Sequence, residues 1–129
     1  MREMIRRAGA QHLAITPDGP RGPRRQVQGG AIYLASRTGM PLVPAGFAFE
    51  DPWRAGSWDR MALPRPFRRA RGIVGKALEV PPDLDREGLE AYRLLAQKAM
   101  DEIQDRAERA ARGEPTQDRF LSLEELVDV

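Results

Sequence analysis

The residues best equipped for chemistry lie between Thr16 and Arg25, in the run TPDGPRGPRR. Arginine side chains carry planar guanidinium groups that donate two hydrogen bonds at once to phosphate or carboxylate oxygens. An aspartate among them can orient a guanidinium or accept a proton from a hydroxyl, and glycines permit close approach by a ligand. The run predicts an anion-binding loop with the candidate residues Asp18, Gly19, Arg21, Gly22, Arg24 and Arg25. A solvated turn whose arginines only favour solubility explains this stretch, taken alone, equally well.

A second stretch, residues 50–71, interleaves aromatic and arginine side chains. Such a mixture is typical of a segment at a lipid headgroup layer, where rings and long cationic side chains both find partners. Stacking on single-stranded nucleic acid uses the same residue types. The candidates for a membrane-facing role are Trp53, Trp58, Arg65, Phe67, Arg68 and Arg69. A slightly favoured alternative for the tryptophans is that they pack over a sheet and leave only the arginines exposed.

Short apolar segments predict the elements that position the anion loop. Leu13–Thr16 predicts a buried strand before the loop, and residues 31–38 predict a helix that ends at Gly39. The nearly continuous apolar run 42–49 is typical of a strand covered on both faces, and residues 73–80 predict a third strand. A strand, loop, helix and strand in this order normally close into two parallel strands, with the loop at the carboxyl edge of the sheet. We therefore expect an α/β fold with this core.

The acidic half of the chain predicts one long helix over residues 83–113. Asp85 is a suitable N-cap, apolar residues recur every three or four positions after it, and Gly113 ends the pattern. We expect this helix to cover the sheet and to carry no chemistry. Residues 114–129 form a polar linker and an acidic tail. At the other end, residues 2–9 have the pattern of a helix's last turns, which suggests that further elements precede them.

Composition excludes several kinds of chemistry. The chain of 129 residues has no cysteine and one histidine, His12. Disulfides, thiolate zinc sites and cysteine nucleophiles are therefore excluded, and we expect no metal site and no resident cofactor. No apolar run approaches the ~20 residues of a membrane span, and the first residues lack the apolar core of a signal peptide. Residues 1–80 carry a net charge of +8 and residues 81–129 a net charge of −6. The basic part suits nucleic acid, anionic lipid or a phosphorylated small molecule.

The arginine-bearing run also resembles a known family block. Residues 17–22, PDGPRG, are similar to the P-E-G-T-R-S block of the glycerolipid and lysophospholipid acyltransferase superfamily, and residues 40–45, MPLVPA, resemble the apolar strand that follows it. A closer resemblance is to the small bacterial branch long labelled a domain of unknown function. There the same pieces occur in the order seen here in residues 16–23, 28–41, 57–60 and 64–67. The resemblance covers residues 10–80.

The resemblance implies transfer of a fatty acyl group from acyl-CoA or acyl-carrier protein to a hydroxyl of a phosphorylated or lipid acceptor. In the family the P-E-G-T-R-S block helps to bind the acceptor's phosphate, and by matched position Asp18 stands for its glutamate, Arg21 for its arginine and Gly22 for its serine. Residues 1–82 are then the acceptor-binding half of such a domain. Its expected location is the cytoplasmic side of the inner membrane, as a peripheral protein.

The family's catalytic dyad, His-x-x-x-x-Asp, is absent, because the position five residues after His12 is Pro17 and Asp18 follows one residue too late. No catalytic residue is therefore assigned, and the chain is expected to bind anions and to catalyse little alone. A catalytically inactive phosphate-binding paralogue is one alternative. An arginine-rich nucleic-acid-binding module is another, although no named nucleic-acid motif is present. The oligomeric state stays open.

Overall fold

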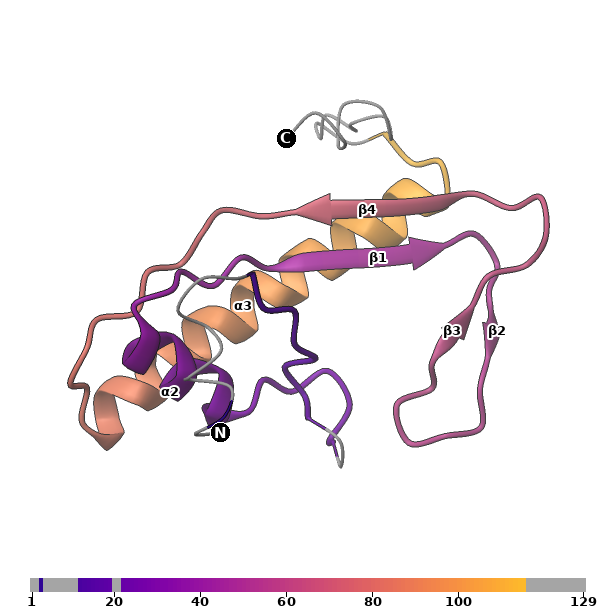
Figure 1. Ribbon diagram of the computed structural model, residues 1–129. Coiled ribbons are helices and arrows are strands. Elements are labelled where there is room, and N and C mark those ends of the chain that lie inside the picture. Colours follow the sequence, from indigo (N-terminus) through magenta and orange to yellow (C-terminus); the bar gives the residue numbers. More distant parts are fainter. Residues whose placement is uncertain (1–2, 4–11, 20–21, 116–129) are drawn as a thin grey trace.

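A computed structural model describes residues 3, 12–19 and 22–115. These residues form two helices and two small antiparallel sheets, a mixed α/β arrangement (Figure 1). In chain order the elements are α2 (Gly29–Thr38), β1 (Ala45–Phe49), β2 (Trp53–Arg54), β3 (Ala62–Leu63), β4 (Ala70–Val74) and α3 (Arg86–Ala111). The predictions for residues 2–9 and for the acidic tail fall almost entirely outside the described residues.

The main sheet pairs β1 with β4 in antiparallel register, from Ala45 opposite Val74 to Phe49 opposite Ala70. Backbone pairing continues beyond the strands, because Leu42 and Leu78 exchange hydrogen bonds of 2.8 and 2.7 Å. Proline lacks an amide hydrogen and interrupts a regular ladder. Pro44 therefore separates this outer bridge from β1, although its carbonyl still accepts a hydrogen bond from Gly75 N at 2.8 Å.

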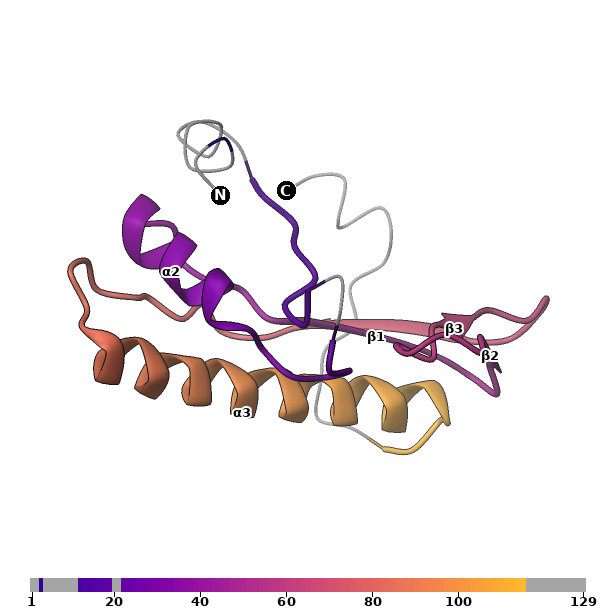
Figure 2. The same cartoon turned by 90° about the horizontal axis from the view of Figure 1, so that it is seen from below.

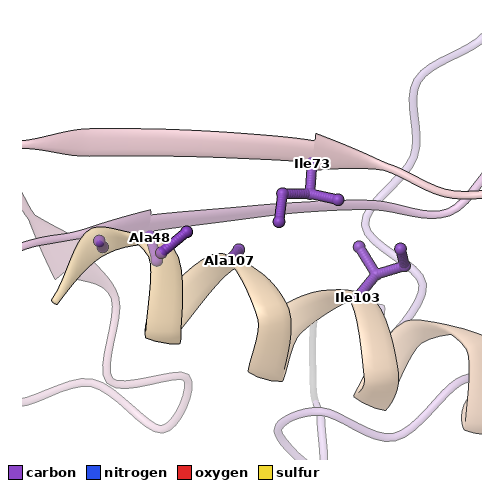
Figure 3. Packing of buried hydrophobic residues seen from close by; sticks show 6 residues of the cluster. Ala48, Ile73, Ile103 and Ala107 are labelled. Atoms are coloured by element: carbon purple, nitrogen blue, oxygen red, sulfur yellow. The ribbon is translucent and has the colours of Figure 1, made fainter. Parts of the chain in front are cut away.

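Helix α3 covers one face of the main sheet and forms the larger apolar core with it (Figures 1 and 2). Small residues bring the helix close to the strands, and Ala48, Ile73, Ile103 and Ala107 lie between them (Figure 3). A Cβ atom added at Gly46 would stand 2.9 Å from the Ile103 side chain. Close packing of this kind tolerates little change in volume. The contact therefore fixes where α3 lies along the sheet.

Helix α2 packs on the first half of α3 and forms a second core. Its buried members are Val27, Ile32, Ala35, Val80 and Ala96. The backbone of Gly39 is left-handed, with φ of 70°, and its amide donates to the Ala35 carbonyl at 2.9 Å. The predictions of a helix over residues 31–38 and of its glycine stop are confirmed. The long helix and its N-cap are confirmed as well, since the Asp85 carboxylate accepts a hydrogen bond from Gly88 N at 2.7 Å.

The predicted strand Leu13–Thr16 is wrong. These residues belong to no strand, and Leu13 and Ile15 keep 40% and 37% of their surface exposed. They lie on the side of the main sheet away from α3 (Figure 2). A short apolar run indicates a preference for burial but does not specify a pairing partner. Without this strand, the predicted parallel pair is also absent from the described residues, and the only partner that β1 has there is antiparallel.

Two further expectations about the strands need correction. The strand predicted over residues 42–49 is shortened to Ala45–Phe49, and the third strand lies at Ala70–Val74 rather than at residues 73–80. The first of these strands is covered on one face only, because Phe47 is 67% exposed on the other. Helix α3 buries Gly46 and Ala48, and alternation along a strand places the residue between them on the opposite face. No helix among the described residues is long and apolar enough to cross a membrane.

Candidate functional site

The predicted anion loop, residues 17–25 and here called the arginine loop, is held at both ends by hydrogen bonds. Gln28 N donates to the Pro17 carbonyl at 2.8 Å, and the Gln28 side-chain amide reaches the Gly22 carbonyl at 3.4 Å. The Asp18 carboxylate accepts a hydrogen bond of 3.4 Å from Arg25 N across the loop. Asp18 thus braces the backbone of the loop. Arg21 lies outside the described residues.

Helix α3 clamps the C-terminal end of the arginine loop with polar side chains. The Gln97 amide accepts from Val27 N at 2.7 Å and donates to the Arg25 carbonyl at 2.8 Å. Arg93 donates to the Val27 carbonyl at 3.3 Å, and Arg25 forms an ion pair with Glu108. The helix therefore contacts the arginine loop as well as covering the sheet. A polar stripe at helical spacing, residues 93, 97, 104 and 108, was the available signal.

The short sheet β2–β3 closes a hairpin, residues 53–63, that meets the arginine loop from the other side. The Trp58 ring lies against Gly22, where an added Cβ atom would come within 2.6 Å of two ring carbons. Gly22 also has a φ of 72°, a conformation that side chains rarely adopt. A glycine is therefore required at this contact. Sequence reasoning assigned Gly22 and Trp58 to separate sites, whereas the fold joins them.

The charges of three other arginines act on Arg24, and the four are here called the arginine cluster: Arg24, Arg25, Arg54 and Arg60. Burial lowers the pKa of Arg24, and the neighbouring charges of the other three cations lower it further. Glu108 opposes this shift. The Arg54 guanidinium donates to the Arg60 carbonyl at 3.3 Å, which orients it across the hairpin. Sequence reasoning did not assign Arg54 and Arg60 to the arginine loop, although the charges of both act on Arg24.

Glu108 is the carboxylate that faces this cluster. Partial burial by itself raises its pKa, but hydrogen bonds from Gln104 and Arg25 and the charges of Arg25 and Arg54 together outweigh burial, so the pKa of Glu108 is lowered. The carboxylate is therefore held ionised, and it neutralises only part of the positive charge around it. A cavity of about 250 Å³ opens beside it, with Arg54, Glu108 and Arg112 among its lining residues.

The predicted membrane-facing residues lie on the hairpin and on the connection from β3 to β4. Trp53 stacks under the Arg65 guanidinium, 5.1 Å from ring centroid to carbon, and remains half-exposed like Trp58. The alternative that both tryptophans are packed over a sheet is therefore wrong. Phe67 is fully exposed on the connection from β3 to β4, while Arg69 pairs with Glu50 at 3.4 Å. Arg68 is exposed beside them and has no hydrogen bond or ion pair to the rest of the described chain.

An apolar cavity of about 600 Å³ borders the arginine loop. Its lining comes from residues 12–17, α2, residues 40–47 and the middle of α3. Pro17, the first residue of the arginine loop, and Val27, two residues after its end, both line the cavity. The unpaired residues Leu13 and Ile15 form part of its wall. Within residues 3, 12–19 and 22–115, no three histidine or carboxylate side chains are grouped as metal ligands would be.

Comparison with known proteins gives one relative and no family. No family model and no solved structure matches the chain. An uncharacterized protein of Rickettsia prowazekii (strain Madrid E) is 35% identical over 72 residues, which are 56% of this chain and 33% of that protein. The matched part thus spans about a third of the length of this curated relative.

Proposed function

We propose that this chain is the acceptor-binding half of an acyltransferase of the lysophospholipid or glycerolipid type. The acyl donor would be acyl-CoA or acyl-carrier protein, and the acceptor a phosphorylated lipid at the cytoplasmic surface of the membrane. The observation that carries the proposal is the junction of the arginine loop with the apolar cavity at Pro17 and Val27. A ligand with a phosphate and an acyl chain has the same two chemistries side by side.

Each half of that ligand has a matching region. Guanidinium groups of the arginine cluster suit phosphate oxygens, for which bidentate contacts are strong. The cavity suits an acyl chain, because each buried methylene contributes about 0.8 kcal/mol. The half-exposed Trp53 and Trp58 and the fully exposed Phe67 suit contact with a headgroup layer. The resemblance of residues 10–80 to the acyltransferase superfamily agrees with this assignment.

Catalysis is expected to need residues beyond those described. The family's histidine base has no counterpart in this chain, and loss of a positioned base typically costs ~10²–10⁴ in rate. The 129-residue chain mixed with acyl-CoA and lysophosphatidic acid should therefore show no turnover above background. Turnover that Arg21→Ala abolishes would contradict the assignment of this chain as a half-site.

Ligand binding tests the proposal directly. The chain should bind lysophosphatidic acid at least tenfold more tightly than inorganic phosphate, because the acyl chain adds apolar burial. Val43→Asp places a charge on an exposed residue of the cavity lining and should remove that preference without changing phosphate affinity. Val74→Asp is the matched control, since Val74 is 65% exposed against 52% for Val43 but lies outside the cavity. Equal affinities for the two ligands would exclude the proposal.

Nucleic-acid binding is a second candidate, favoured by the half-exposed Trp53 of the hairpin, which lies beside Arg65. Stacked bases and phosphates would use these two side chains. Salt separates the candidates, because nucleic-acid affinity falls steeply with the logarithm of salt concentration. A lysolipid held largely by its acyl chain should keep most of its affinity between 50 and 200 mM salt. Nucleic-acid affinity should fall by about an order of magnitude or more over the same range.

A further inference from the structure

The hydrogen bonds at the two ends of the main sheet show which backbone groups point out of it. Glu50 N donates to the Arg69 carbonyl at one end, and Gly75 N to the Pro44 carbonyl at the other, each at 2.8 Å. In an antiparallel ladder, residues that bond to the partner strand alternate with residues whose N–H and C=O point away from it. The residues of β4 whose backbone groups point away from β1 are Ala70, Gly72 and Val74.

The outer edge of β1 is covered by other parts of the chain. By the same alternation Phe47 points its backbone groups away from β4, and its carbonyl accepts a hydrogen bond from the Gln104 side chain at 3.1 Å. The hairpin lies on this side of the main sheet (Figure 1). Arg54 and Ala62 of the hairpin line the cavity of about 250 Å³ together with Phe47. Helix α3 and the hairpin thus occupy the edge of β1.

The outer edge of β4 is open by comparison. The Ala70 carbonyl accepts a hydrogen bond of 3.0 Å from the guanidinium of its neighbour Arg71. Within the described part of the chain, the N–H and C=O groups of Gly72 and Val74 have no hydrogen-bond partner. Strand β4 also contains no lysine and no proline, two residues that commonly protect an edge strand from pairing. This edge therefore presents backbone groups with which another strand can pair.

The sequence of β4 suits antiparallel pairing with a second copy of itself. Pairing about Gly72 places Ala70 opposite Val74 of the second copy, and Arg71 opposite Ile73, so that no two like charges lie directly opposite each other. All three outward-pointing residues then have partners. A register centred on Arg71 would instead place two arginines opposite each other, which is destabilising. The charge pattern thus favours a single register.

We propose that this chain associates with a second copy of itself through the free edge of β4. The two main sheets of two strands each then join into one antiparallel sheet with both β4 strands at its centre. The two-fold axis is perpendicular to the sheet, so the two α3 helices cover the same face. No residue of β4 lines the apolar cavity, and the inference does not rest on the proposed function.

Sedimentation equilibrium of the 129-residue chain measures the association. We expect a reversible equilibrium between monomer and dimer. A chain that stays monomeric up to about 1 mM would overturn the proposal. Association that continues beyond the dimer would overturn it as well, because antiparallel pairing of two β4 strands uses up the free edge.

Gly72→Pro tests the edge itself. Proline lacks the outward-pointing N–H and places its ring at the edge, so the dissociation constant of the dimer should rise about tenfold or more. Gly72→Ala is the matched control, because its added Cβ atom meets the exposed Phe47 ring at 2.9 Å, as the Cβ atom of proline does, but the N–H is kept. It should change the dissociation constant less than about twofold. Equal dimerisation of the two variants would contradict pairing through β4.

Packing through the open face of the main sheet is the competing mode of association. Phe47 is 67% exposed on that face, and Phe47→Ser removes its apolar ring. Dimers that Phe47→Ser abolishes and Gly72→Pro leaves intact would show face packing and overturn the proposal. Dimers that survive Phe47→Ser and are lost in Gly72→Pro would support it.

Cross-linking decides the matter if Gly72→Pro does not fold. The chain has no cysteine, so introduced thiols have no other partner. Ala70→Cys chains mixed with Val74→Cys chains should form a disulfide with oxidised glutathione, because directly opposite Cα atoms lie about 5.5 Å apart in such a pair. Either variant alone should not cross-link, since each thiol then faces an unsubstituted residue. A mixture that cross-links no better than the separate variants would overturn the proposal.

Discussion

Helix α3 holds two neighbours by contacts of opposite character. Against the main sheet it offers Ile103 and Ala107, which pack without charges onto Gly46, Ala48 and Ile73. The arginine loop and the nearby Val27, in contrast, are held by the Gln97 side-chain amide, the Arg93 guanidinium and the ion pair of Arg25 with Glu108.

The two contacts serve different purposes. Apolar close packing has a large effect on the free energy of unfolding and permits few alternatives. Polar contacts contribute less to stability but orient specific atoms and respond to pH and to bound ions. Helix α3 thus holds the main sheet with its apolar residues and positions the arginine loop with its polar residues.

The largest effect is expected at the apolar contact. Ile103→Ala should lower the free energy of unfolding by about 2–5 kcal/mol. The substitution leaves a cavity where the Ile103 side chain was, and the helix backbone, already in contact with the sheet, cannot move in to fill it. Urea unfolding measures the change. Leu95→Ala, an exposed position of the same helix, is the control and should cost about 0.5 kcal/mol or less. Similar losses at both positions would remove the distinction between the two contacts.

A middle-sized effect is expected at the polar contact. Gln97→Ala leaves the amide of the buried Val27 without its acceptor, which costs about 1–3 kcal/mol. The same change frees the Arg25 carbonyl, so phosphate affinity should fall with stability. Lys98→Ala, at an exposed neighbouring position, should change neither quantity. A Gln97 variant that loses stability but keeps full phosphate affinity would show that the clamp does not position the loop.

The smallest effect should depend on pH and should arise at Glu108. Its pKa is lowered in the folded chain, so its stabilising effect is fully present above the ordinary value of 4.5 and is lost as pH falls through the lowered folded value. Glu108→Gln should therefore be less stable than the parent at pH 7, with the difference shrinking below about pH 4.5. Unfolding measured across this range tests it, with the exposed Glu102→Gln as control. A difference that stays constant with pH would contradict the ion-pair assignment.

Local signals in the sequence predicted the helices well. Asp85 caps α3 and Gly39 ends α2 because each depends on its own backbone neighbours only. Strand pairing was not predictable in the same way. Leu13–Thr16 has the composition of a buried strand, but composition does not specify which strand it would pair with. Among the described residues it pairs with no strand. The shortening of the next strand at Pro44 was predictable from the sequence, because proline has no amide hydrogen to donate to the ladder.

The candidate site was predicted in part. Asp18, Gly22 and Arg25 lie together as expected, because they are close in sequence. The contributions of the hairpin and of α3 were missed, since the contact between Arg25 and Glu108 joins residues 83 positions apart. The helical spacing of Gln97 and Glu108 in the sequence does predict that their side chains lie on one polar face of the helix. Only the folded chain shows which loop that stripe faces.

The position of α3 in the chain has a consequence for synthesis. The two strands that pack on this helix leave the ribosome before it does, since β4 ends at Val74 and Ala107 follows 33 residues later. At a translation rate of roughly 5–20 residues per second, these strands wait about 2–7 seconds for their apolar cover. During that interval β1 and β4 can pair with strands of other chains. Slow codons for residues 75–107, or a chaperone bound while these residues are synthesised, would therefore change the yield of folded protein more than its final stability.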